Sequence, residues 1–347
     1  MKKVSVVMCT YNGAPYLRQQ LDTIINQTYP IHELIVQDDQ STDDTMAVLE
    51  EYAARYPFMQ VHRKQQRKGI ADNFLTAMAY ATGDYIALSD QDDIWELTKI
   101  EEQINAIGDS WICYHPSPPF NGDKPLFDYI VDPRIPNCGL EIIFGNGCVL
   151  GHTMLLRRSL FNKMIEHVPQ AMFSGLYNHL FHDGILFIVA NALEEDCICP
   201  ITYVNSPLTW HRRSDASVTK GEERRDLSKR TWGNAMRLVL RNINPKRRKE
   251  IAPLIYDRLC AIRLLLDCFP MSSSTAGARK MINAYCDKKW YGGFVFLCES
   301  VKNRNKIFYA PEKNQFIATL RALLLPITMY DKYTIAYRYK KEGRPDA

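Results

Sequence analysis

Residues 85–93 read Tyr-Ile-Ala-Leu-Ser-Asp-Gln-Asp-Asp, an apolar run that ends in three carboxylates within four positions. The apolar run is typical of a buried strand, and the acids stand where that strand ends. Carboxylates this close together repel one another and resist burial, so a cation is expected beside Asp90, Asp92 and Asp93. The ordinary alternative is a solvated loop or the N-cap of a helix.

The pattern on the N-terminal side of this stretch predicts an α/β fold. Short apolar segments alternate with segments whose apolar residues recur at helical spacing. Such a βαβαβαβ order implies a mainly parallel sheet flanked by helices, with right-handed crossovers and ligands bound at the carboxyl ends of the strands. Strands are expected at residues 4–9, 34–36, 59–61 and 85–88, and helices at residues 17–25, 46–53 and 71–78.

The rest of the chain divides into two parts. A further strand is expected at Cys148–Leu156, followed by a helix from Ser159, and the sheet domain is expected to span residues 1–218. Residues 219–347 show only helical periodicity and are interpreted as a helical C-terminal appendage.

Composition and charge limit the cellular setting. The ten cysteines include no Cys-x-x-Cys pair, which favours neither a zinc site nor a disulfide framework and fits a reducing cytoplasm. No apolar run reaches the length of a membrane span. The net charge of +4 gives no reason to expect nucleic acid as a partner, but basic clusters gather in the last third of the chain. These clusters are solvated helix faces or contacts to an anionic membrane surface, and residues 320–326 are a lipid-seated amphipathic segment or the core of the appendage.

Polar residues follow each of the first four expected strands. An aromatic wall and a hydrogen-bond acceptor suit a nucleoside, and a divalent metal suits a diphosphate. Tyr11 can supply the wall and Asp39 the acceptor, while Asp90 and Asp92 can hold Mg²⁺ or Mn²⁺ through oxygen ligands. Together these features indicate a nucleotide-sugar site.

With these motifs in order, the sequence resembles the family 2 glycosyltransferases, which have the GT-A fold. The resemblance is strong over roughly the first 100 residues, moderate from 140 to 215 and slight beyond. The Asp-Gln-Asp-Asp-Ile-Trp wording of residues 90–95 is most similar to the rhamnosyltransferase-like branch, which builds bacterial surface polysaccharides. The carrying segments are residues 4–12, 27–30, 33–43, 69–73 and 83–95.

The resemblance implies roles for residues in the first half of the chain. Tyr11 and Asp39 would hold the base, Asp92 would bind the metal, Asp90 would help hold the ribose or the metal, and Asp93 would cap the next element of the fold. The remaining residues implied to bind the donor in this half are Thr10, Asn12 and Asn73.

In the second half, Asp183 stands where the family places the general base, although it could instead cap the helix that begins there. Here the chain departs from the family pattern, because His182 replaces the usual acid and Gly184 an aromatic residue. Arg212 and Arg213 stand where relatives carry basic residues near the donor diphosphate; the alternative is an exposed charged loop.

The resulting hypothesis is an inverting glycosyltransferase that moves one sugar from dTDP-rhamnose or a UDP-sugar to a glycan or polyprenyl-linked glycan. It would act in the cytoplasm at the inner face of the plasma membrane, with peripheral contact through the C-terminal region. Two alternatives come from other classes: a Mg²⁺-dependent phosphatase of the haloacid dehalogenase type, which also uses an Asp-x-Asp after a strand, and a sugar-nucleotide-binding protein without catalysis.

Overall fold

The computed structural model describes residues 1–120, 132, 134–145, 149–193, 199–213 and 232–333. These residues fall into two compact units, one formed by residues 1–135 and 149–214 and the other by residues 136–148 and 215–347. The predicted boundary at residue 218 lies outside the described residues.

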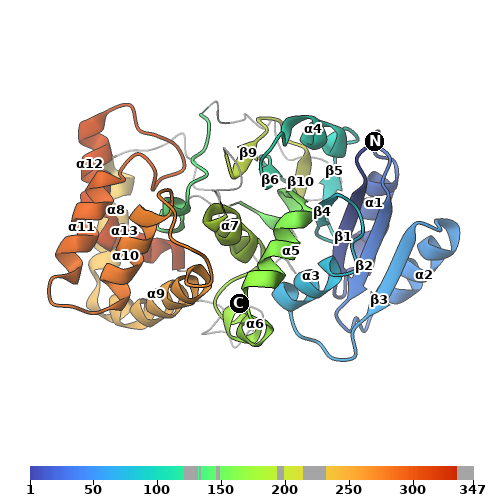
Figure 1. Cartoon of the computed structure of the whole chain (residues 1–347), viewed down its shortest axis with the longest axis horizontal. Helices are drawn as coiled ribbons and strands as arrows, with labels where there is room; N and C mark the ends of the chain where they lie inside the picture. Colours follow the sequence, from blue (N-terminus) through green and yellow to red (C-terminus); the bar gives the residue numbers. More distant parts are fainter. Residues whose placement is uncertain (121–131, 133, 146–148, 194–198, 214–231, 334–347) are drawn as a thin grey trace. The chain divides into compact units, whose positions relative to one another are not determined.

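A seven-stranded sheet forms the centre of the first unit, with strand order β3-β2-β1-β4-β8-β6-β9 (Figure 1). The four strands expected from the first part of the sequence lie side by side and parallel, which confirms the α/β fold class. Only β8 runs against its neighbours β4 and β6. The strands are β1 (Val4–Thr10), β2 (Glu33–Asp38), β3 (Met59–Arg63), β4 (Tyr85–Ser89), β6 (Ile112–Tyr114), β8 (Leu155–Arg157) and β9 (Ile201–Tyr203).

Helices cover both faces of this sheet, which explains why β1, β2 and β4 are buried almost throughout. Alternate residues of β1, namely Val4, Val6 and Met8, pack with apolar residues of α1, α2 and α4 in one core. On the other face, α3 contacts β1 and β2, and α7 contacts α3 and α5. The helices are α1 (Ala14–Ile25), α2 (Thr45–Arg55), α3 (Ile70–Met78), α4 (Lys99–Ala106), α5 (Arg158–His167), α6 (Gln170–Tyr177) and α7 (His182–Ala192).

A small second sheet, in the order β5-β10-β7, lies beyond the end of β4. Its central strand, β10 (Thr209–Arg212), pairs with β5 (Ile94–Trp95) and with β7 (Pro119–Phe120). Because β5 directly follows the acidic loop, this sheet brings residues 209–212 beside the acids at positions 90–93.

The strand expected at Cys148–Leu156 is wrong in extent. Residues 151–153 form a short 3₁₀ helix, η2 (Gly151–Thr153), and the strand begins only at Leu155. The Thr153 hydroxyl donates to the Leu150 carbonyl, and the buried Lys99 ammonium donates to the His152 carbonyl (2.8 Å), so these carbonyls are bonded outside the sheet. The turn directs His152 toward the acidic loop.

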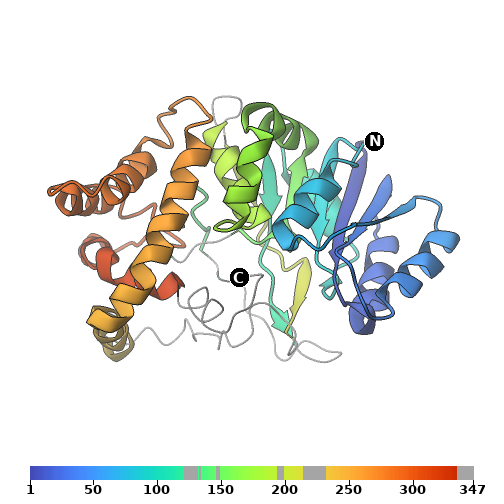
Figure 2. The same ribbon diagram turned by 90° about the horizontal axis from the view of Figure 1, so that it is seen from below.

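The described part of the second unit is helical, as predicted, and contains no strand. Its longest helix, α9, is drawn along its length in Figure 2. In the segment at residues 320–326, Ala322 and Leu325 are buried whereas Leu323 is exposed. The elements are η1 (Leu140–Ile143), α8 (Trp232–Ile243), α9 (Pro245–Leu266), α10 (Ala276–Cys286), α11 (Gly292–Lys302), α12 (Gln315–Leu323), α13 (Leu325–Thr328) and η5 (Met329–Tyr333).

Candidate active site

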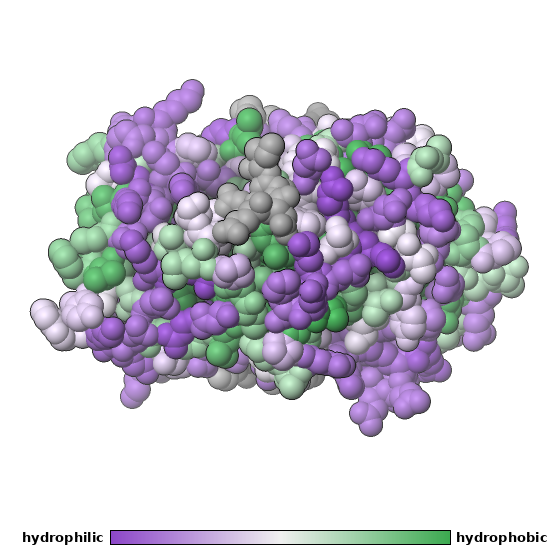
Figure 3. Space-filling model, in the orientation of Figure 1, coloured by the Kyte–Doolittle hydropathy of each residue, from purple (hydrophilic) through white to green (hydrophobic). Residues whose placement is uncertain are grey.

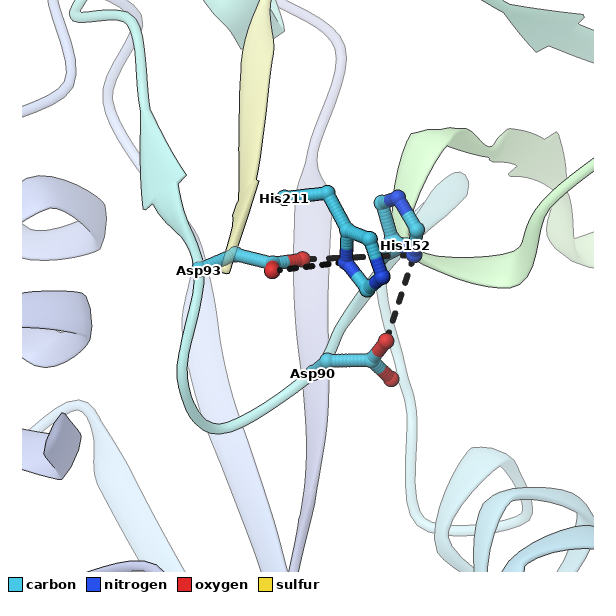
Figure 4. A group of neighbouring side chains, drawn as sticks. All are labelled: Asp90, Asp93, His152 and His211. Atoms are coloured by element: carbon cyan, nitrogen blue, oxygen red, sulfur yellow. Dashed lines mark hydrogen bonds and ion pairs between the residues drawn. The ribbon is translucent and has the colours of Figure 1, made fainter. Parts of the chain in front are cut away.

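Four side chains from three separate segments meet at the carboxyl end of β4: Asp90, Asp93, His152 and His211 (Figure 4). One ligand atom from each lies within 4.8 Å of the others. His152 Nδ1 lies 3.2 Å from Asp90 Oδ2, and His211 Nδ1 lies 3.1 Å from Asp93 Oδ1. The two imidazole rings stack at 4.6 Å and are nearly parallel. The acidic loop is therefore part of a compact cluster of carboxylates and imidazoles.

A second layer of hydrogen bonds holds these four side chains in place. Ser117 Oγ contacts His152 Nε2 at 2.9 Å, so the opposite ring nitrogen of His152 faces Asp90. The Arg212 amide donates to Asp93 Oδ1 (3.1 Å), and its Nε donates to the Asp92 carbonyl (2.7 Å). Such outer bonds fix the rotamer and ring orientation of ligating groups.

Burial and mutual repulsion make the three acids electrostatically unequal. Burial opposes ionisation of Asp90, but the hydrogen bond from His152 and the charges of nearby histidines hold its pKa at about 2. Burial, with repulsion from Asp93 and Asp90, raises the pKa of Asp92 to about 7. Burial lowers the pKa of His211, yet its bond to Asp93 outweighs this and raises that pKa. The site thus concentrates negative charge that cationic groups neutralise.

The cluster has the donor set of a divalent-metal site. Asp93 Oδ2 is buried and has no hydrogen-bond partner among the described residues, so it offers a lone pair to a cation. Carboxylates together with imidazoles suit Mn²⁺, whereas Mg²⁺ favours an all-oxygen shell. Asp92 lies outside this group of four, and its predicted ligation of metal remains a prediction. Asp93 does not cap a helix as expected, since β5 comes directly after it.

Three predicted donor-binding residues hold the strand ends together. Thr10 is buried and donates to Asp38 Oδ1 across the β1–β2 pair. Asn73 is buried and exchanges hydrogen bonds with Gln37 of β2. Asp39 accepts from the amides of Lys68 (3.0 Å) and Gly69 (2.9 Å), so its carboxylate closes the loop that precedes α3. A carboxylate has further lone pairs, so this closure leaves Asp39 able to accept from a ligand.

The loop after β1 is held from the acidic loop. Gln91 binds both the amide (2.9 Å) and the carbonyl (3.0 Å) of Tyr11, and a Cβ at Gly13 would lie 2.1 Å from Gln91 Oε1. The Arg67 guanidinium lies 3.9 Å from the Tyr11 ring centroid. Asn12 has a positive φ of 50° and accepts from the Thr42 amide. The predicted aromatic wall is thus tied directly to the acids.

Of the two predicted basic residues, Arg212 is buried at the acidic loop. Its guanidinium lies between the rings of Tyr16 (4.7 Å) and Phe120 (4.5 Å). Arg213 pairs its amide with the Phe120 carbonyl. The alternative of an exposed charged loop therefore does not describe Arg212, which is 3% exposed.

Asp183, the predicted base, lies in the first turn of α7 and is partly exposed. Its carboxylate accepts from the Gly151 amide at 3.3 Å and from the Gly184 amide at 2.6 Å. The residue after Gly151 is His152, so η2 joins Asp183 to the carboxylate–imidazole cluster through one peptide unit. Asp183 also accepts from an amide of its own helix, so a capping function and a chemical function are both compatible with its position.

His182 is buried against η2 and stacks on Phe74 at 4.0 Å. Neither of its ring nitrogens has a hydrogen-bond partner in the described part of the chain. Burial lowers the pKa of His182, although Asp183 and Asp90 act in the opposite direction. The departure from the family pattern at this position is therefore an imidazole whose neutral form is favoured.

Sequence reasoning missed His152 and Asp93 as members of the cluster. His152 fell within an expected strand, and only the turn at η2 reveals its direction. Asp93 could have been recognised by its place in the acid triplet next to the His211–Arg213 segment, but no local signal pairs residues so distant in sequence.

The fold and site together define a class, the nucleotide-sugar-dependent glycosyltransferases with a GT-A fold. Residues 5–165 match the model of Glycosyl transferase family 2. This part of the chain is therefore a family 2 glycosyltransferase domain, as predicted. The match ends before Asp183, His211 and Arg212.

Two curated relatives match the N-terminal part of the chain. The UDP-Glc:alpha-D-GlcNAc-diphosphoundecaprenol beta-1,3-glucosyltransferase WfgD of Escherichia coli is 32% identical over 162 residues, 46% of this chain and 62% of the relative. The dTDP-rhamnosyl transferase RfbG of Shigella flexneri is 32% identical over 149 residues, 38% of this chain and 52% of the relative. In both cases the chain spans less than two thirds of the relative's own length.

A solved structure shares the fold at low sequence identity. Residues 1–349 of TarS from Staphylococcus aureus align over 99% of this chain and 92% of that chain, with a TM-score of 0.54 and 15% identity. This likeness supports the GT-A architecture. The comparisons give no support to the haloacid dehalogenase alternative.

Proposed function

We propose that this protein is an inverting, metal-dependent glycosyltransferase that moves one sugar from a nucleotide-sugar donor to a glycan acceptor. The observation that carries the proposal is the link through η2: Gly151 binds Asp183, and His152 binds Asp90. A general base and a diphosphate-binding metal must both lie near the anomeric carbon in a direct displacement, and one short turn of backbone fixes both groups here.

Asp90, Asp93, His152 and His211 would hold the cation, and their mixed donor set favours Mn²⁺. When bound, the cation would offset the negative charge of the diphosphate leaving group. Arg212 lies beside this cluster and adds a fixed positive charge on the same side. The acids alone would repel a diphosphate, so the cation and Arg212 make donor binding electrostatically favourable.

Asp183 would remove the proton from the acceptor hydroxyl as the new bond forms. The two amides that bind its carboxylate orient it and leave lone pairs for the hydroxyl. The neutral form of His182, favoured by burial, would place no second charge beside this base. Tyr11 and Asp39, at the ends of β1 and β2, would hold the nucleoside.

The names of the relatives suggest the donor and the acceptor. WfgD is named for UDP-Glc and a diphosphoundecaprenol-linked sugar, and RfbG for dTDP-rhamnose. We therefore propose dTDP-rhamnose or a UDP-sugar as donor and a polyprenyl-linked glycan as acceptor. A membrane-held acceptor would place the reaction at the inner face of the plasma membrane.

The test separates donor binding from turnover. Wild-type protein should show a Mn²⁺-dependent thermal shift with one member of a panel of UDP, dTDP and GDP sugars, and that donor should then support transfer. Asp183→Asn should bind the donor with unchanged affinity but lose about 10²–10⁴-fold in turnover, the usual contribution of a general base. Asp109→Asn, at an exposed carboxylate, is the matched control. Full turnover by Asp183→Asn, or transfer unaffected by a chelator, would refute the mechanism.

A further inference from the structure

The turn between α10 and α11 in the helical unit exposes an unusual set of aromatic side chains. Trp290 is 95% exposed and Phe294 is 71% exposed, and Tyr291 between them is 41% exposed. Fully exposed tryptophan is costly in water, since a large apolar surface stays hydrated. A contiguous exposed group of this kind marks an interaction surface.

The neighbouring helix α12 extends this apolar surface. α11 and α12 pack against each other, and α12 exposes Phe316 (74%) and Leu323 (44%). Figure 3 shows hydrophobic residues along the edge of this unit where Figure 1 draws α11 and α12. We call this surface, formed by Lys288–Phe294 and the exposed side chains of α12, the aromatic edge.

Cations border the aromatic edge. Lys288 and Lys289 directly precede Trp290 and are exposed. A surface hollow of about 240 Å³ beside the turn is lined by Lys288, Lys289 and Arg248. A second hollow of about 210 Å³ shares Lys289 and is also lined by Lys280. Residues 232–333 carry 18 Lys and Arg against 7 Asp and Glu, a net charge of +11, although the whole chain carries only +4.

We propose that the aromatic edge docks this protein on a bilayer that contains anionic lipid. Tryptophan and tyrosine prefer the headgroup level of a membrane, where an apolar ring and a polar N–H or O–H are both satisfied. Lys288 and Lys289 would reach lipid phosphates while Trp290 and Phe294 enter the acyl boundary. The strong positive charge of the helical part selects an anionic lipid surface over an uncharged one.

This inference goes beyond the proposed function and does not depend on it. A partner protein or a second copy of the chain would also cover aromatic side chains. The adjacent lysines and the excess of positive charge favour phosphate-rich lipid, because protein–protein contact surfaces are depleted in lysine.

Flotation with vesicles tests the proposal in the absence of donor and acceptor. Wild-type protein should float with vesicles of phosphatidylcholine containing phosphatidylglycerol and remain unbound with phosphatidylcholine alone. Trp290→Ala/Phe294→Ala should lower partitioning by about tenfold or more, because two large apolar side chains are lost. Lys288→Gln/Lys289→Gln should lower it by a similar factor, and added salt should mimic that change.

Matched controls come from the first unit. Lys2→Gln/Lys3→Gln removes another adjacent pair of exposed lysines, and Leu97→Ala removes an exposed apolar side chain; neither should change partitioning. Brominated lipid should quench tryptophan fluorescence in the wild type and lose most of this effect in Trp290→Phe.

Three results would overturn the proposal. These are wild-type protein that does not float with anionic vesicles, a Trp290→Ala/Phe294→Ala variant that floats as the wild type does, and quenching that persists in Trp290→Phe. A wild-type dimer that becomes monomeric in Trp290→Ala/Phe294→Ala without any flotation would instead assign the aromatic edge to a second copy. Since no sugar is transferred in these assays, a negative result leaves the proposed catalytic function intact.

Discussion

Gly151→Ala should damage stability and catalysis together, through His182. A Cβ built on Gly151 lies 2.4 Å from His182 Nε2 and within 3.4 Å of two further ring carbons of that imidazole. His182 is buried and stacked on Phe74, so the ring cannot retreat without losing that contact. Overpacking of this kind costs about 1–3 kcal/mol. For a unit of this size, the melting temperature should fall by about 2–4 °C for each kcal/mol.

The same displacement should reach the chemistry. The Gly151 amide binds Asp183, and the next residue, His152, binds Asp90, so a shift of η2 moves the proposed base and the metal cluster relative to each other. Misplacement of a reacting group by about 1 Å can cost about 10²-fold in rate. We expect turnover to fall by about that factor while the donor affinity changes less.

The assay is a double-mutant cycle. His182→Ala removes the atoms that the new methyl group meets, so Gly151→Ala/His182→Ala should be more stable than the sum of the single changes predicts, by about 0.5–3 kcal/mol. Gly175→Ala is the control, because no atom lies within 4 Å of a Cβ at that position in α6 and alanine favours helix. If Gly151→Ala melts with the wild type, or if its effect adds independently to that of His182→Ala, the reasoning is refuted.

Three further predictions concern the surroundings of the site and the sheet. Ser117→Ala should weaken Mn²⁺ affinity by about 10–100-fold, because the partner that orients His152 is lost, and titration calorimetry that shows equal affinity would contradict this. Asp39→Ala should destabilise the protein by about 1–3 kcal/mol by leaving two backbone amides unpaired, and thermal unfolding without donor measures this loss separately from binding. Burial tends to raise the pKa of Glu33, but hydrogen bonds from neighbouring hydroxyl and amide groups lower it below 4.5, so Glu33 stabilises the fold above that pH and loses this effect as the pH falls through its folded-state pKa. Glu33→Gln should therefore be less stable than the wild type at pH 7, and denaturant titrations should show the difference narrowing below pH 4.5; a constant difference would contradict the assignment.

The first 100 residues could be predicted from the sequence because their information is local. Strands such as β1 and β4 are continuous apolar runs between helices with clear periodicity, and parallel pairing then places Thr10 beside Asp38 and Ser89 beside Met8. The polar residues after these strands must share one edge of the sheet. The topology alone therefore brings Tyr11, Asp39 and the acidic loop together.

The later part of the site could not be predicted in the same way. The segment at residues 148–156 is apolar enough to be interpreted as one strand, but the turn at η2 depends on hydrogen bonds to residues distant in sequence, among them Lys99. Thr10 and Asn73 were expected to bind a donor, and the structure gives each a buried partner within the fold. A polar residue at a strand end is therefore ambiguous until its hydrogen bonds are known.

The composition of the cluster explains why the acid triplet reveals only half of the site. Carboxylates crowded after a strand announce themselves in sequence, because three acids in four positions are rare and electrostatically costly. The histidines that complete the group arrive singly, on η2 and on β10, and each is an unremarkable residue in its own segment. What joins them is the small sheet, in which β10 pairs with β5 directly after the acids. The metal specificity of the site therefore rests on a pairing of short strands, and the aspartates supply only the charge that makes such a pairing useful.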